Sequence, residues 1–227
     1  MDKYKITKPG GFCTTDTTVI KSIEEATEKL NPTFAKNDLH LAQVFKKAGY
    51  STYAVGKLEW GFIATRKQMK DRGWDEYYGY LDHQKCHGFY PSFLFESGKI
   101  DIIEGNTHPD AAKHPEGDGV EERKIRWNME GKKQFAEDIF INKIVSYIER
   151  KHEDPFFLYF PTLLPHGPTS IPTIHPEIAE NDNLNIFEKE YASMVKMLDT
   201  NVGIIINTLK EQGLYDNTII IFMADNL

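Results

Sequence analysis

Three short polar stretches of the sequence carry side chains that can bind an anion or a metal ion. Lys57 follows Gly56, and His166 lies in a proline-rich loop. Near the end of the sequence, a carboxylate and a carboxamide stand side by side at Asp225 and Asn226. A lysine neutralises an oxyanion, a histidine binds one or moves a proton, and the two oxygen donors suit a hard cation such as Ca²⁺ or Mg²⁺. Such a set is typical of a site that cleaves a sulfate or phosphate ester.

Each stretch also has an ordinary structural explanation. A lysine such as Lys57 is more often solvated at the surface, and an Asp-Asn pair commonly ends a strand. His166 is equally compatible with a histidine that is hydrogen-bonded inside a rigid turn. His83 and His87 lie among aromatic residues, where most histidines are structural. No single stretch therefore identifies a function, and their positions along the chain matter more.

All three stretches come directly after apolar runs that predict strands, at residues 50–55, 156–160 and 218–223. The last two runs are apolar enough for strands buried on both faces of a sheet. Helices predicted between the runs make the strands parallel, so that their carboxyl ends open on one edge of the sheet. We therefore expect the three polar stretches to lie at this edge, within roughly 10–15 Å of one another.

Apolar residues at helical spacing predict three helices, at residues 37–48, 135–152 and 187–212. The alternation of helices and strands predicts an α/β fold with a mainly parallel sheet sandwiched by helices. The side chains expected to face the core from the first and third helices are Leu41, Val44, Phe45, Ala48, Tyr191, Met194, Val195, Leu198, Val202, Ile205 and Leu209.

Two long segments show no regular pattern. Residues 60–95 are rich in glycine and aromatic residues, which predicts irregular chain that is nevertheless packed. Residues 98–134 are polar and broken by glycine and proline, which predicts a long loop that is either inserted near a site or mobile.

Composition and charge place the chain among ordinary globular proteins. It has 227 residues, of which 40% are hydrophobic and 27% charged, and its formal net charge is −7. This acidic balance argues against binding to nucleic acid or to an anionic membrane. Cys13 and Cys86 are the only cysteines, so a disulfide framework is not expected, and their pairing stays open. No apolar run reaches transmembrane length, and the first residues lack the apolar core of a signal peptide.

Four blocks of the sequence follow one another in the order and at the spacing of a known family. They read DLHLAQVFKKAGYSTYAVGK, GWDEYYGYLDHQKCHGFYPSFLFESGK, PFFLYFPTLLPHGP and YASMVKMLDTNVGIIINTLKEQGLYDNTIIIFMADN. These blocks resemble the formylglycine-dependent sulfatases, the arylsulfatase-type branch of the alkaline phosphatase superfamily. The resemblance implies an incomplete alkaline-phosphatase-like α/β fold, with an irregular N-terminal segment at 1–36 and a partial catalytic domain at 37–227.

The resemblance also implies a role for each polar stretch. Lys57 and His166 resemble the family's sulfate-binding lysine and histidine, and Asp225 and Asn226 resemble its late pair of calcium ligands. The implied activity is hydrolysis of the sulfate ester of a carbohydrate or aryl substrate, in which a formylglycine hydrate attacks sulfur. Ca²⁺ is the implied cofactor. Intact relatives are often periplasmic, secreted or lysosomal.

The sequence departs from the family's pattern at three places. Glu59 stands where the family has a histidine two residues after the lysine. Cys13 lies in Cys13-Thr14-Thr15-Asp16, without the proline and arginine of the family's C/S-x-P-S/T-R, so formylglycine is not expected there. The family's N-terminal strand with its paired metal aspartates is not recognised either. These departures predict a truncated or split chain that is inactive alone, together with a complementing fragment that carries the missing part.

Two other functions stay open on the sequence alone. A phosphoesterase or phosphodiesterase of the same superfamily uses a Ser or Thr nucleophile in the segment that is not recognised here. A non-catalytic remnant or binding module agrees with Glu59 and with the absent nucleophile motif. The expected partner is a small-molecule or glycan sulfate ester, rather than nucleic acid or a membrane.

Overall fold

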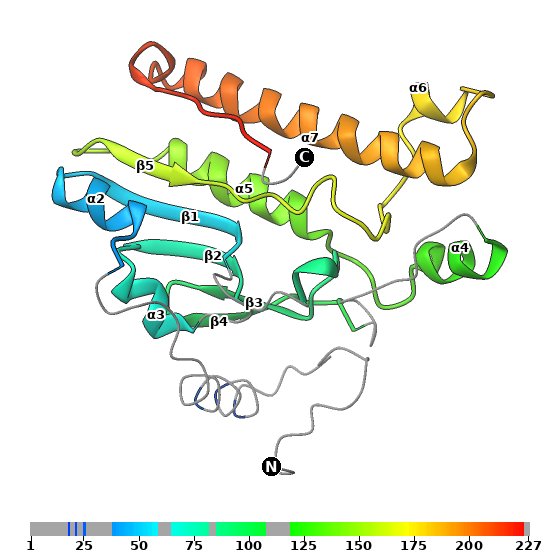
Figure 1. Ribbon diagram of the computed structural model, residues 1–227, viewed down its shortest axis with the longest axis horizontal. Helices are drawn as coiled ribbons and strands as arrows, with labels where there is room; N and C mark the ends of the chain where they lie inside the picture. The colour runs from blue at the N-terminus through cyan, green and yellow to red at the C-terminus, as the bar shows by residue number, and fades with distance from the viewer. Residues whose placement is uncertain are drawn as a thin grey trace.

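The computed structural model describes most of the chain from residue 38 onward (Figure 1). The described residues are Thr18, Lys21, Glu25 and the ranges 38–58, 65–81, 85–107 and 119–224. The predicted N-terminal segment at 1–36 lies outside them apart from those three single residues. The expected domain division therefore stays a prediction.

A mixed five-stranded sheet forms the centre of the fold. Its strands follow the order β4 (Lys99–Ile102), β3 (Phe93–Glu96), β2 (Glu76–Tyr80), β1 (Ser51–Lys57) and β5 (Phe156–Tyr159). β1 runs parallel to both β2 and β5, whereas β3 and β4 continue the sheet in antiparallel fashion beyond β2. The predicted α/β fold is confirmed, and the parallel strands are the ones that lead to the predicted site.

Helices cover both faces of this sheet. On one face, α5 (Ala136–Ile148) packs against β1 and β2, and α7 (Ile186–Glu211) packs against α5 (Figure 1). The other face carries a second hydrophobic core, to which α2 (Leu41–Lys47) and α3 (Arg66–Asp71) contribute. Within the described ranges, no helix combines the length and the apolar character that crossing a bilayer requires.

Alternate side chains of β1 belong to the two different cores. Tyr53 and Val55 belong to the core formed with α5 and α7, and Ala54 belongs to the core formed with α2 and α3. All three side chains are between 0% and 3% exposed. Successive side chains of a strand point to opposite faces, so a strand that is covered on both faces reads as a nearly continuous apolar run.

The second and third predicted helices are confirmed as α5 and α7. Phe140, Ile144 and Ile148 form the buried row of α5, at 0–1% exposure. α7 begins with a capping box, in which Asn185 accepts a hydrogen bond from the backbone N–H of Glu188 and the Glu188 side chain accepts one from the backbone N–H of Asn185. This exchange satisfies donors that the first turn of a helix leaves unpaired.

The first predicted helix forms, but it starts at Leu41 and buries other side chains than expected. Leu41 and Val44 are 60% and 43% exposed, whereas Ala42 is buried. The helix is short and meets β1 through this small residue. Phe45 stacks on Phe157 of β5 with ring centroids 4.1 Å apart, so the helix meets the sheet through Ala42 and Phe45.

α7 also turns part of its predicted apolar stripe toward solvent. Met194 and Leu209 are buried, but Tyr191 and Val195 are 46% and 45% exposed. α7 packs against α5 along one side only. Its apolar stripe is wide enough for a helix with more neighbours, so part of the stripe stays exposed to solvent.

The strand predicted at 218–223 is wrong. After α7 and the 3₁₀ turn η2 (Tyr215–Asn217), this stretch has no regular secondary structure and pairs with no strand of the described sheet. Its large apolar side chains lie in solvent, with exposed fractions from 45% at Ile220 to 89% at Ile219. An apolar, β-branched composition forms a strand only where a neighbouring strand completes the backbone hydrogen bonds.

β5 forms where it was predicted, but at the edge of the described sheet. Phe156, Phe157 and Leu158 are half-buried, and Tyr159 is 37% exposed. The expectation that this strand is buried on both faces is therefore wrong, because β1 is its only partner among the described strands.

The two segments without a clear pattern contain regular elements. Residues 60–95 hold α3, β2, the 3₁₀ turn η1 (Lys85–His87) and all of β3 except its last residue, and residues 98–134 hold β4 and α4 (Val120–Trp127). The connection between β5 and α7 includes the short helix α6 (Pro176–Ala179). The expectation that the aromatic residues are packed is confirmed, because many of them belong to the two cores.

Candidate functional site

Lys57 and His166 lie at the same edge of the sheet. Lys57 is the last residue of β1, and its backbone N–H donates a hydrogen bond of 2.8 Å to the carbonyl oxygen of Pro161, just after β5. His166 follows in the loop that begins there. Because β1 and β5 are parallel neighbours, their carboxyl ends open side by side. The structure thus places both residues just beyond the carboxyl ends of neighbouring parallel strands, while their sulfate-binding roles stay predictions.

Two glycines let the strands approach closely at this edge. Gly56 of β1 and Gly79 of β2 are register partners, with φ angles of 122° and 149°. A Cβ atom on Gly56 would lie 2.3 Å from the carbonyl oxygen of Pro161, and one on Gly79 would lie 2.1 Å from the carbonyl oxygen of Gly56. Both obstacles are backbone atoms, so the strands can meet in this way only if neither position has a side chain. These glycines therefore set how near Lys57 stands to the neighbouring loops.

A buried carboxylate holds the loop that carries His166. Glu137, in the first turn of α5, accepts a hydrogen bond of 2.9 Å from the Thr162 hydroxyl and another from the backbone N–H of Leu163. Farther along, the backbone N–H of His166 donates to the carbonyl oxygen of Leu163 at 3.0 Å. The loop is thus fixed to a helix at its base, while the His166 side chain at its tip is exposed.

The imidazole of His166 presents one nitrogen to its surroundings. Its Nδ1 lies 2.5 Å from the carbonyl oxygen of Gly167. A carbonyl oxygen only accepts hydrogen bonds, so Nδ1 carries a proton and Nε2 is left for a ligand. In the neutral ring Nε2 accepts a proton, and in the charged ring it donates a hydrogen bond to an anion. The geometry therefore suits both proton transfer and anion binding.

Burial raises the pKa of the Glu137 carboxyl group from 4.5 to about 7. The hydrogen bonds from the backbone of Leu163 and the hydroxyl of Thr162 favour the charged form, but the loss of water around the carboxylate outweighs them. The base of the His166 loop therefore contains a group that changes charge near neutral pH.

We expect the free energy of unfolding to fall as the pH rises from about 4.5 to about 7, because of Glu137. Its pKa is higher in the folded chain than in the unfolded chain, so the folded state binds this proton more tightly. The resulting stability is complete below the unfolded pKa and is lost as the pH passes the folded pKa. The full change is roughly 3 kcal/mol. Urea denaturation across this pH range measures it.

Glu137→Gln keeps an oxygen for the Leu163 backbone and removes the titration, so this variant should flatten that part of the profile. Glu149→Gln, which changes an exposed carboxylate next to the same helix, is the matched control and should keep the wild-type slope. Equal slopes in wild type and in Glu137→Gln would contradict the assignment.

A second imidazole, which sequence reasoning missed, stacks on His166. His87 ends η1, and its ring centroid lies 4.5 Å from that of His166 with an angle of 7° between the ring planes. η1 follows β2, the other parallel neighbour of β1. In the sequence, His87 lies in a segment without periodicity, and only recognition of β2 as a parallel strand would have placed it at this edge.

The described residues do not fit a complete calcium site. Nowhere in the described ranges do three His, Cys, Asp or Glu side chains gather in a way that would hold a metal ion. Asp225 and Asn226, the predicted calcium ligands, lie outside those ranges, and so do Glu59 and Cys13. Cys86 is described, and its side chain is buried.

A buried ion pair lies beyond the His166 loop. Glu190 of α7 accepts hydrogen bonds from Arg126 Nη2 at 2.7 Å, Trp127 Nε1 at 2.6 Å and Thr169 Oγ1 at 2.7 Å. The side chains of Arg126 and Glu190 are both 0% exposed. The three donors come from α4 and from the segment after the His166 loop, so one carboxylate joins these parts to α7.

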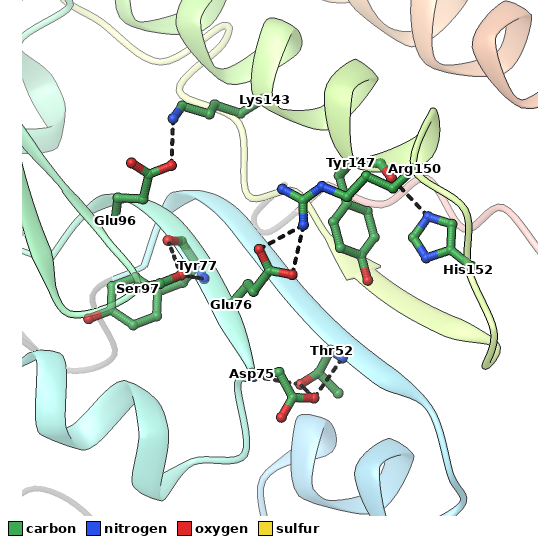
Figure 2. Close-up of polar contacts among 10 residues, drawn as sticks. All are labelled: Thr52, Asp75, Glu76, Tyr77, Glu96, Ser97, Lys143, Tyr147, Arg150 and His152. Atoms are coloured by element: carbon green, nitrogen blue, oxygen red, sulfur yellow. Dashed lines mark hydrogen bonds and ion pairs between the residues drawn. The ribbon is translucent and has the colours of Figure 1, made fainter.

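Another set of polar contacts lies at the amino-terminal end of the parallel strands. Figure 2 shows Arg150 facing Glu76, and its Nη1 donates to both carboxylate oxygens at 2.8 Å. Asp75 contacts Thr52 nearby (Figure 2). Burial disfavours the charge of Asp75, but hydrogen bonds from Lys46 and Thr52 outweigh it and lower the pKa of that carboxyl group. These contacts connect strands and helices at the end opposite Lys57.

A cavity of about 200 Å³ also lies apart from the two predicted site residues. It opens between α2 and β5, and its walls are mostly apolar and aromatic. Neither Lys57 nor His166 lines this cavity, so it is not part of the candidate site at the carboxyl ends of β1 and β5. The lining residues are His40, Leu41, Ala42, Arg72, Trp74, Phe157 and Tyr159.

Comparison with known protein sequences points to one family. Residues 13–227 match the sulfatase family. The N-acetylgalactosamine-6-O-sulfatase of Bacteroides thetaiotaomicron is 27% identical over an alignment of 228 residues, gaps included, and the match covers 82% of this chain and 42% of that protein. The N-acetylgalactosamine-6-sulfatase of Homo sapiens is 26% identical over 192 residues, which cover 82% of this chain and 32% of that protein. The chain thus spans less than half the length of these relatives.

Solved structures share the fold of this chain. The crystal structure of Ps i-CgsB has a TM-score of 0.55 and 23% sequence identity, and the match covers 78% of this chain and 37% of that chain. The structure of Ps i-CgsB in complex with k-i-k-neocarrahexaose has a TM-score of 0.53 and 24% identity. This likeness agrees with the expected alkaline-phosphatase-like arrangement of sheet and helices.

Proposed function

The chain belongs to the sulfatase family, and on that premise we propose that it takes part in the hydrolysis of a sulfate ester. In this proposal Lys57 and His166 bind the sulfate group. The observation that carries it is their position, at the carboxyl ends of neighbouring parallel strands inside the region that matches the family. In open α/β sheets, this is the edge at which ligands bind.

The chemistry of the two side chains fits this role. Negative charge on the ester oxygens grows as the S–O bond breaks, and the ammonium group of Lys57 stabilises it. His166 has its Nδ1 proton directed at Gly167, so Nε2 faces the reacting group as a hydrogen-bond donor or as a proton carrier. The hold of Glu137 on the loop base keeps the imidazole in place before substrate binds.

We further propose that Asp225 and Asn226 supply part of a calcium site. Ca²⁺ takes roughly 6–8 oxygen ligands, and two side chains supply fewer than half of them. The other ligands and the nucleophile must then come from a different segment. Cys13 lacks the proline and arginine that accompany the family's nucleophile, so formylglycine is not proposed at this residue.

A complementing fragment is the proposed source of these missing groups, and the edge beside β5 is its proposed docking place. β5 is apolar throughout but ends the described sheet, and the apolar stretch at 218–223 is exposed. Both have the composition of strands that are covered on both faces. An added strand at this edge gives β5 a second neighbour and satisfies backbone groups that an edge strand leaves open.

The proposed substrate is the sulfate ester of a carbohydrate. Both relatives described above are named as sulfatases of N-acetylgalactosamine, which supports a glycan over a simple aryl sulfate. An aryl sulfate nevertheless serves as a convenient assay substrate, because the sulfate group is the part that Lys57 and His166 recognise in this proposal.

We expect the purified chain alone to show no hydrolysis of an aryl sulfate, with or without calcium. The reason is that its sequence contains no C/S-x-P-S/T-R nucleophile motif. Co-expression with the N-terminal part of a sulfatase that carries this motif should produce turnover, measured as release of the coloured phenol. The same fragment with its nucleophile replaced by alanine is the matched control.

Two outcomes would contradict the proposal. Turnover by the chain alone that disappears in Cys13→Ala would identify Cys13 as a nucleophile and remove the need for a fragment. A complemented pair that hydrolyses an aryl phosphate but no sulfate ester would instead favour a phosphoesterase of the same superfamily.

A further inference from the structure

The chain leaves the protein interior only briefly to present His166. Leu163 and Leu164 precede it and are 1% and 4% exposed, and Thr169 and Ser170 follow it at 2% and 1%. We call these two buried residue pairs the outgoing arm and the return arm. His166 is exposed between them, so the place of its imidazole depends on how each arm is held.

Each arm is bonded to a different buried acidic side chain. In the outgoing arm, the backbone N–H of Leu163 donates a hydrogen bond to Glu137 of α5. In the return arm, the hydroxyl of Thr169 donates one of 2.7 Å to Oε2 of Glu190 of α7. Glu137 and Glu190 are both 0% exposed. Water therefore does not compete for these two bonds, and each arm has one fixed attachment point.

Helix packing sets the positions of the two attachment points relative to each other. Glu137 lies in the first turn of α5, and Glu190 lies near the start of α7. The two helices pack side by side over the sheet (Figure 1). The separation of the two acidic side chains is therefore a property of rigid elements, and the loop between the arms does not determine it.

Further hydrogen bonds keep the carboxylate of Glu190 from moving with the loop. Its Oε1 accepts a hydrogen bond of 2.6 Å from Trp127, and its Oε2 accepts one of 2.7 Å from Arg126 in addition to the one from Thr169. Hydrogen bonds to an ionised acceptor are about twice as strong as those between neutral groups. Thr169 is thus bonded to a carboxylate that α4 already holds in one orientation.

We propose that Glu190 is a positioning residue for the imidazole of His166, and that it acts through the hydroxyl of Thr169. This inference rests on the proposed function and adds to it a residue that does not contact the sulfate group. With Glu137 on the outgoing arm and Glu190 on the return arm, the imidazole keeps one place beyond the end of β5 before substrate binds. A displacement of about 1 Å is enough to cost on the order of 10²-fold in rate, so loss of the return-arm bond has a measurable effect on turnover.

The test changes Thr169, because a change of Glu190 itself would also leave the buried Arg126 without its ionic partner. Thr169→Val keeps the branched shape at Cβ and removes only the hydroxyl. In the chain complemented with the fragment that carries the nucleophile, kcat for an aryl sulfate should fall roughly 10–100-fold. Thr169→Ser, which restores a hydroxyl, should recover most of it. In NMR spectra of the full chain alone, the imidazole C–H signals of His166 should shift or broaden in Thr169→Val and return in Thr169→Ser. The signals that are missing in His166→Phe identify them.

Thr208→Val is the matched control. Thr208 is also buried, at 6% exposure, and its hydroxyl donates a hydrogen bond of 2.9 Å to the carbonyl oxygen of Ile204 within α7. It lies about 27 Å along the helix from Glu190, given the rise per residue of an α-helix. This variant should lose a similar amount of stability in urea denaturation, but it should keep kcat and the His166 signals of wild type. Equal changes of kcat and of these signals in Thr169→Val and Thr208→Val would overturn the inference.

Comparison with His166→Phe separates the inference from the proposed function. If His166→Phe abolishes turnover while Thr169→Val keeps the kcat and the His166 signals of wild type, Glu190 and Thr169 only stabilise the fold. This inference is then wrong, but the proposed function stands. If Thr169→Val changes the His166 signals while His166→Phe keeps full turnover, Glu190 positions the ring and the proposed function is wrong. The NMR measurement needs no fragment, so it decides the positioning of the ring even where complementation gives no turnover.

Discussion

Arg126→Met should lower the free energy of unfolding by roughly 3–5 kcal/mol, because it leaves a carboxylate buried without its ionic partner. Arg126 Nη2 lies 2.7 Å from Glu190 Oε2, and both side chains are fully buried. The hydrogen bonds from Trp127 and Thr169 remain, but neither donor carries a positive charge. Since these contacts join α4 and α7 to the segment after the His166 loop, urea denaturation should show a loss that involves the whole domain.

Arg150→Met is the matched control for this prediction. It removes the same type of side chain from an ion pair with Glu76, in which the two side chains are 49% and 43% exposed. Exposed ion pairs contribute about 0–1 kcal/mol, so the control should be close to wild type. Equal losses in the two variants would show that the burial of Glu190 does not determine the cost. The double variant Arg126→Met/Glu190→Gln should recover part of the loss, because it removes the buried charge as well.

Lys57→Ala should lower kcat/KM of the complemented chain by about 10²–10³-fold, the size expected when one group that stabilises transition-state charge is lost. Lys57 ends β1, and the backbone hydrogen bond from its N–H to Pro161 does not depend on its side chain. The fold should therefore be unchanged by circular dichroism. The measurement is turnover of an aryl sulfate by the chain co-expressed with the fragment that carries the nucleophile.

Lys143→Ala is the control for the lysine. Lys143 lies on α5 and forms an ion pair with Glu96 of β3, a strand that does not lead to the proposed site, so its removal should leave kcat/KM unchanged. A loss below about tenfold for Lys57→Ala would be too small for direct contact with the sulfate group. Retained activity in that variant would therefore remove Lys57 from the proposed site, and with it the observation on which the function rests.

Much of the fold was predictable where the apolar pattern was long and periodic. β1, α5 and α7 each bury a face or row that the sequence marks clearly, and a capping box begins α7. The aromatic segment at 60–95 was not predictable in the same way. β2 reads Glu-Tyr-Tyr-Gly-Tyr, and consecutive aromatic residues hide the alternation by which a strand is recognised.

Position within a sheet was harder to predict than the presence of a strand. The apolar run of β5 has the same composition whether one strand or two lie beside it, and the stretch at 218–223 has strand composition without a partner in the described sheet. The composition of a segment shows whether its side chains suit a buried environment. It does not report which neighbours are present, and backbone pairing depends on those neighbours.

The candidate site was predictable in part. Lys57 and His166 follow strands that the sequence marks, and the parallel direction of these strands was enough to assign both residues to one edge of the sheet. Glu137 was not predictable as the support of the His166 loop, because an acidic residue in the first turn of a helix is ordinarily explained by the helix dipole. The contact of His87 with His166 depends on the path of two loops, which no local pattern in the sequence encodes.

The exposed apolar stretch at 218–223 has a consequence for the behaviour of the chain at high concentration. It contains no charged residue and no proline, and segments of this kind from several chains can pair with one another as intermolecular β-structure. Correct assembly then competes with self-association, which depends more steeply on concentration than folding of a single chain does. A complementing fragment that adds a strand over this stretch would protect the chain from self-association as well as supply catalytic groups. To do so, the fragment would have to bind soon after the chain is synthesised.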